Sequence, residues 1–120
     1  MNTGKTTSLQ LHTMRKIEVV IHAENRDLVE DIFKAAGISG WTMIRDVSGM
    51  GHPGFHDGKT IFNDRTGLVM FVGVAAAKEI SEVAESLARL FETCAGVLFL
   101  SDVEVIRSDY FATARSAHAT

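Results

Sequence analysis

The hydrophobic residues of this chain follow the period of a strand in some segments and the period of a helix in others. Residues 16–22 place Ile17, Val19 and Ile21 on one face, which predicts a β-strand. Residues 26–36 instead repeat apolar side chains at helical spacing, which predicts an amphipathic helix. The first regular elements of the chain are therefore expected to be a strand and then a helix.

Four further segments extend this order. Residues 41–48 predict a second strand, and residues 68–75 are nearly all apolar, which is typical of a central strand buried on both faces. Residues 78–92 return to helical spacing. Residues 97–107 predict a last strand that begins apolar and then alternates with acidic residues, as expected at an edge or an interface.

The predicted order, β-α-β-β-α-β, is typical of an α+β fold of the ferredoxin-like class. Both helices would cover one face of an antiparallel sheet, and self-association could cover the apolar side chains of the other face. We expect one domain over residues 15–112, with disordered tails at residues 1–14 and 113–120. Residues 49–67 contain five glycines and the only proline, and we interpret them as a long functional loop between the second and third strands.

The composition of the chain limits the kinds of partner that such a domain is expected to bind. The chain has 120 residues and a net charge of −3, without a run of Lys and Arg, so we expect no nucleic-acid partner. Its one cysteine, Cys94, excludes an intramolecular disulfide and favours a reducing, cytoplasmic setting. The first residues lack the apolar core of a secretory signal, which agrees with that location.

Two other kinds of function have some support in the residue types of the loop. His52, His56 and Asp57 are suitable ligands for a transition metal, although their spacing matches no recognised zinc motif. Asp46 and Asp64 lie near Asp57 in the sequence, but no nucleophile–base pair or carboxylate pair stands out. We therefore expect no catalytic residues and no enzyme activity, although a ferredoxin-like scaffold alone does not exclude one.

The segment GISGWTMIRDVSGMG, residues 37–51, resembles the PII family of signalling proteins. That family has a G-x-x-G-x-T turn, a strand that ends in V-x-G-x-G, and then a long T-loop. The matching residues in this chain are Gly37, Gly40, Thr42, Val47, Gly49 and Gly51. Residues 102–107 are similar to the closing strand of the family, and the likeness spans residues 16–107.

The resemblance implies a homotrimer that binds adenine nucleotides in three clefts between subunits. It places Gly40 and Thr42 at the adenine pocket, and it makes Arg107 a phosphate-binding residue. The full set of nucleotide-binding residues that it implies is Gly40, Thr42, Gly49, Met50, Gly51, His52 and Arg107. Lys59 and Arg65 of the T-loop are candidate binding residues for an anion such as phosphate or bicarbonate.

Three departures from the family pattern narrow the expected ligand. His52-Pro53 replaces an Arg-Gln pair, which weakens the usual magnesium and 2-oxoglutarate site, and residues 52–67 lack a tyrosine for uridylylation. Residues 92–96 are too short for the glycine- and lysine-rich B-loop, which favours ADP, AMP or a cyclic nucleotide over a triphosphate. These departures are similar to PII-like groups associated with bicarbonate transporters and carboxysomes.

The resemblance implies a regulator with no resident cofactor, whose ligands are ADP or AMP and bicarbonate. A bound nucleotide would favour one T-loop conformation, and a membrane transporter or an enzyme would recognise that conformation. The alternative is a trimeric CutA-like protein that binds a metal through His52, His56 or Asp57.

Overall fold

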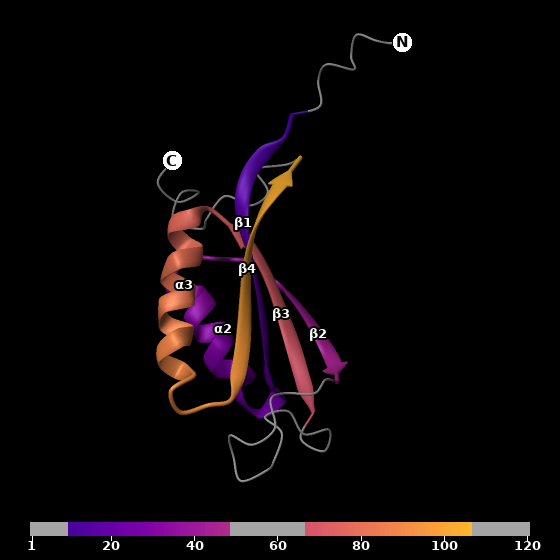
Figure 1. Ribbon diagram of the computed structural model, residues 1–120, viewed down its shortest axis with the longest axis vertical. Coiled ribbons are helices and arrows are strands. Elements are labelled where there is room, and N and C mark those ends of the chain that lie inside the picture. The colour runs from indigo at the N-terminus through magenta and orange to yellow at the C-terminus, as the bar shows by residue number, and fades with distance from the viewer. Residues whose placement is uncertain (1–9, 49–66, 107–120) are drawn as a thin grey trace.

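A computed structural model of the chain describes residues 10–48 and 67–106. In this part of the chain, four antiparallel strands form one sheet and two helices lie on one of its faces (Figure 1). The elements in chain order are β1 (His12–His22), η1 (Ala23–Asn25), α2 (Arg26–Ala35), β2 (Thr42–Val47), β3 (Leu68–Ala75), α3 (Ala77–Leu90) and β4 (Gly96–Val105). The predicted ferredoxin-like order of elements is thereby confirmed.

The strand order across the sheet is β2-β3-β1-β4, so β2 and β4 are the two edge strands. The core lies between the sheet and the helices. It includes the fully buried Ile17, Val19 and Ile21 of β1, as the alternation in the sequence predicts. The ring of Phe33 on α2 packs edge-on against Trp41, with ring centroids 5.5 Å apart, and lies 5.9 Å from the ring of Phe71 on β3.

Helix α2 ends where Gly37 adopts a φ of 89°, a conformation that glycine takes without steric cost. The Gly37 N–H donates to the Lys34 carbonyl, and the Ile38 N–H donates to the Phe33 carbonyl. These two bonds form a Schellman motif, which satisfies the last carbonyls of the helix. Ile38 is buried against the core, so the chain is held firmly where it turns towards β2.

Two features of the strands differ from the sequence prediction. β1 begins at His12, before the predicted start of the domain at residue 15, because residues 12–14 pair with residues 103–105 of β4. The second difference concerns β3, which is not buried on both faces within one chain. Its side chains towards the helices are buried, whereas Met70, Val72 and Val74 on the other face are only half-buried.

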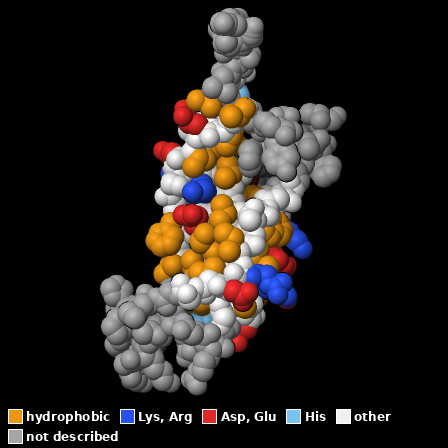
Figure 2. Space-filling model, turned by 90° about the vertical axis from the view of Figure 1, so that its right-hand side faces the viewer, with side chains coloured by type: hydrophobic (Ala, Val, Ile, Leu, Met, Phe, Trp, Pro, Cys, Tyr) orange, Lys and Arg blue, Asp and Glu red, His pale blue; other side chains and the backbone are white. Residues whose placement is uncertain are grey.

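The sheet face that carries no helix is here termed the open face. The strand registers place on it the side chains of Met14, Val20, Ile44, Met70, Val72, Val74, Val97, Phe99 and Val103. Phe99 is 56% exposed and Ile44 is 43% exposed. Figure 2 shows this face, where hydrophobic side chains form a broad patch that is interrupted by basic and acidic side chains.

Candidate functional site

The start of β2 positions the two predicted nucleotide-binding residues that the structure describes. Thr42 is the first residue of this edge strand, and its exposed side chain shares the open face with Val72 of β3. Gly40 lies two residues earlier in the chain and is also exposed. The structure therefore brings Gly40 and Thr42 together at one edge of the sheet, where Phe33 supports the intervening Trp41.

The described part of the chain gives no reason for a glycine at position 40. A Cβ atom added there would meet no heavy atom of residues 10–48 and 67–106 within 4 Å. The glycines with positive φ in the described residues are Gly37 and Gly67, so Gly40 is not needed for its backbone conformation either. Close approach by a ligand or by another subunit would give such a reason.

A β-bulge interrupts β2 before the long segment that follows it. Ile44 pairs with Met70 and Val47 pairs with Leu68, so β2 has one residue more than β3 between these two pairs. Asp46 occupies the bulge with a φ of 58°, a left-handed conformation that Asp tolerates better than most residues. Bulges often lie beside functional sites and change the direction of a strand. This one sets the direction in which the chain enters residues 49–66.

The sequence analysis missed this bulge. Its only trace in the sequence is the polar pair Arg45-Asp46, which breaks the apolar alternation of residues 41–48. Both side chains are exposed in the structure. Such a polar pair also occurs in regular edge strands, so the pattern alone would not have identified a bulge.

The remaining predicted site residues lie outside the described residues. They are Gly49, Met50, Gly51, His52, Lys59, Arg65 and Arg107. His56 and Asp57 of the metal-binding alternative lie outside them as well. Among residues 10–48 and 67–106, no group of three or more His, Cys, Asp or Glu side chains is placed to hold a metal ion.

Within the same ranges, no helix is long and apolar enough to cross a membrane.

The described site residues and the last described strand lie at opposite edges of the sheet. Gly40 and Thr42 belong to the β2 edge, whereas β4, which ends at Val105, forms the other edge. β3 and β1 lie between them, so the two edges are about 14 Å apart at the usual strand spacing. A ligand that contacts both edges of one chain would therefore have to extend across β3 and β1.

Comparison with protein families gives a match over most of the chain. The model of the family "Nitrogen regulatory protein P-II" matches residues 14–110. The chain belongs to the P-II family. No relative among curated proteins matches this sequence.

Solved structures of PII-like proteins have the same fold. CPII from Thiomonas intermedia K12, a nitrogen regulatory PII-like protein bound to ADP, AMP and bicarbonate, is 26% identical. The match covers 88% of this chain and 99% of CPII, with a TM-score of 0.74. A PII-like signalling protein from Thermus thermophilus is 15% identical to this chain. The match covers 85% of this chain and 98% of the Thermus protein, with a TM-score of 0.68. GlnK from B. subtilis is 17% identical to this chain. The match covers 81% of this chain and 99% of GlnK, with a TM-score of 0.59.

These comparisons confirm the PII-like resemblance and the fold class that follow from the sequence. The family is one of signalling regulators, in agreement with the regulatory role expected from the sequence. The similar proteins named above are all PII-like, and they lend no support to the CutA-like alternative.

Proposed function

We propose that this protein is a homotrimeric, non-enzymatic regulator that binds ADP or AMP, together with bicarbonate, in clefts between its subunits. The observation that carries this proposal is the position of β2 and β4 at opposite edges of the sheet. Membership of the P-II family supports it, as does the likeness to CPII, whose structure holds ADP, AMP and bicarbonate.

The argument for clefts between subunits rests on chain connectivity. Thr42 lies on the β2 edge, and Arg107 follows β4 by two residues. Because β3 and β1 separate the two edges within one chain, we infer that the two residues at one nucleotide come from different copies of the chain. Copies related by a rotation axis bring the β2 edge of one next to the β4 edge of another, and three such contacts close a ring.

The chemistry of the described residues suits an adenine base. The Thr42 hydroxyl can both donate and accept a hydrogen bond, as the edge of adenine requires. Gly40 leaves space for a ligand beside the backbone, because no atom of the described residues lies within 4 Å of the position that a Cβ would take. Arg107 would supply a permanent charge for phosphate, while Gly49, Met50, Gly51 and His52 would complete the phosphate side of the site.

The proposed signal passes through the segment between β2 and β3. Lys59 and Arg65 of this segment would bind an anion, either a nucleotide phosphate or bicarbonate. A ligand that binds better to one conformation of the segment shifts the population towards it. A transporter or an enzyme that recognises that conformation would be the partner, and the protein would act in the cytoplasm.

Isothermal titration calorimetry tests the nucleotide site. The wild-type chain is titrated with ADP and AMP, each with and without bicarbonate, and we expect saturable binding near one site per subunit. Thr42→Val keeps the shape of the side chain but removes its hydroxyl, so it should weaken adenylate binding about tenfold. Thr13→Val, at an exposed position of β1, is the matched control and should bind like the wild type.

Two results would contradict the proposal. One is the absence of saturable binding to both nucleotides in the presence and absence of bicarbonate. The other is equal affinity of Thr42→Val and Thr13→Val for a nucleotide that does bind, which would place the adenine pocket away from β2. Steady hydrolysis of a bound nucleotide would instead overturn the non-enzymatic part.

A further inference from the structure

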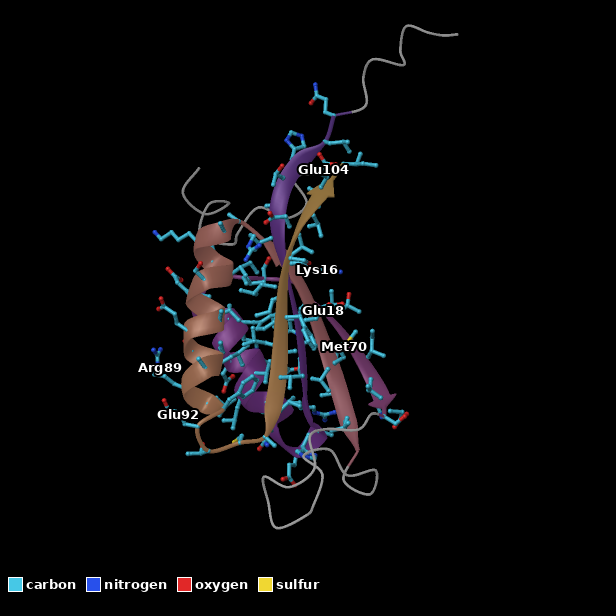
Figure 3. The ribbon with its side chains drawn as sticks, in the orientation of Figure 1. Lys16, Glu18, Met70, Arg89, Glu92 and Glu104 are labelled. Carbon is cyan, nitrogen blue, oxygen red and sulfur yellow. The ribbon has the colours of Figure 1, made fainter. Side chains whose placement is uncertain are left out.

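A charged pair lies inside the apolar open face. Lys16 and Glu18 are two residues apart on β1, so both side chains lie on the same face of the sheet. Lys16 Nζ and Glu18 Oε2 are 3.7 Å apart, and the two side chains are 31% and 32% exposed. In Figure 3 both residues lie with Met70 on the side of the sheet away from the helices.

The surroundings of this pair contain no further charge across the strands. The residues opposite the pair are all uncharged: Val74 and Ser101 beside Lys16, and Val72 and Phe99 beside Glu18. β1 is one of the two inner strands, so these positions lie within the sheet instead of at its rim.

Such a pair contributes little to a single chain. Ion pairs that remain in contact with water contribute little to the stability of a protein. The energetics change when another surface covers the open face. A buried charge without a partner is strongly unfavourable, whereas a buried pair with good geometry offsets most of the cost of removing the charges from water.

We propose that the two charges exchange partners between copies, so that Lys16 of each copy pairs with Glu18 of the next copy in the trimer. This inference rests on the self-association proposed above and specifies its chemistry. The occupant of the open face is a second copy because the face is complementary to itself. It carries one cation and one anion at neighbouring positions along β1, and a rotation axis that runs across the strand direction sets Lys16 of one copy near Glu18 of the next.

The pairing would fix the register and the number of copies. A copy shifted along the face would leave Lys16 or Glu18 buried against apolar side chains, which is strongly unfavourable. The apolar residues of the open face would supply most of the association free energy. The charged pair would instead select one arrangement among the many that an apolar surface allows.

Charge reversal tests the exchange between copies. Lys16→Glu gives a face with two carboxylates, and Glu18→Lys gives a face with two ammonium groups. Each variant alone should lose self-association by at least about a hundredfold, because like charges are then buried together. In an equimolar mixture, each mixed trimer has two contacts between opposite charges and one between like charges, so mixed oligomers should form more readily than oligomers of either variant alone. Analytical ultracentrifugation measures the association, and native mass spectrometry with one chain isotope-labelled identifies the mixed oligomers.

Controls separate this effect from a loss of folding. Lys34→Glu and Glu85→Lys reverse exposed charges on α2 and α3, and each should self-associate like the wild type. Circular dichroism checks the fold of every variant. If a charge-reversal variant does not fold, Lys16→Met and Glu18→Met replace the pair. Each single substitution should then dissociate the oligomer, and the double substitution should restore association with mixed stoichiometry.

The possible results distinguish the two proposals. Wild-type chain that is monomeric up to high concentration would overturn the self-association proposed above and this inference with it. Wild-type oligomers that persist unchanged in Lys16→Glu and in Glu18→Lys would overturn the pairing alone. Variants that dissociate singly and stay dissociated when mixed would also overturn it, because a pair that acts only within one chain gives that result.

Discussion

At the scale of single residues, the site is shaped by backbone conformations that side-chain chemistry alone does not reveal. Gly37 and Asp46 both have positive φ, and they lie on either side of Gly40 and Thr42. Gly37 ends α2, and the sequence predicts it because glycine commonly ends helices. The conformation of Asp46 was not predicted, because Asp is common in many other settings. Only the strand register identifies the bulge that requires it.

The bulge leads to a prediction about Asp46. Asp46→Gly should leave the free energy of unfolding within about 0.5 kcal/mol of the wild type, because glycine adopts a positive φ without strain. Asp46→Val should lower it by about 1–2 kcal/mol, because a β-branched residue is strained there. Urea denaturation measures both. Arg45→Val is the matched control, since Arg45 is exposed and has no positive φ. Equal costs for valine at 45 and at 46 would contradict the assigned strain.

At the scale of elements, hydrophobic periodicity predicted both described α-helices and the four described strands but not the short 3-10 helix η1, and the errors in strand bounds lie where pairing is distant in sequence. β3 was predicted with the observed bounds, Leu68–Ala75, because its apolar run is flanked by breaks in the pattern. β1 was predicted too short, because residues 12–14 are held by residues 103–105 of β4 and not by a local pattern. Of the candidate site, only Gly40 and Thr42 can be located, and their meeting at a sheet edge requires the strand order.

The packing of α2 on the sheet depends on one glycine of β3. A Cβ added to Gly73 would lie 2.9 Å from Cε2 and 3.6 Å from Cζ of Phe33. Gly73→Ala should therefore lower the free energy of unfolding by about 1–3 kcal/mol through overpacking. Phe33→Leu removes both contacting ring atoms, so Gly73→Ala should cost less than about half as much in that background.

A double-mutant cycle measured by urea denaturation checks this coupling. Gly67→Ala is the matched control. Its cost arises from a φ of 73° with open space around it, so Phe33→Leu should leave that cost unchanged. If the changes in the free energy of unfolding caused by Gly73→Ala and Phe33→Leu add within about 0.5 kcal/mol, the glycine is not required to make room for the Phe33 ring.

At the scale of the whole molecule, the two faces of the sheet differ in how far they are covered. The helices cover one face completely enough to bury Ile17, Val19 and Ile21, whereas Phe99 on the open face remains 56% exposed. A single copy thus leaves apolar surface in water, which is unusual for a stable monomer. The proposed trimer would remove this surface and join the β2 and β4 edges at the same time. Formation of the trimer would then cover the open face and complete the nucleotide site in one step.

This link between assembly and stability has a measurable consequence. Association that buries the open face stabilises the folded chain by mass action, so the apparent Tm of the wild type should rise with protein concentration. Phe99→Glu should abolish that dependence. The same variant should also lower the apparent Tm by about 4–8 °C for each kcal/mol of association free energy that is lost. Leu28→Glu, on α2 at 45% exposure, is the matched control and should keep the concentration dependence. Differential scanning calorimetry over a wide range of protein concentrations measures all three chains. A wild-type Tm that does not change with concentration would mean that the open face stays uncovered, because burial between copies must make stability depend on how many copies are present.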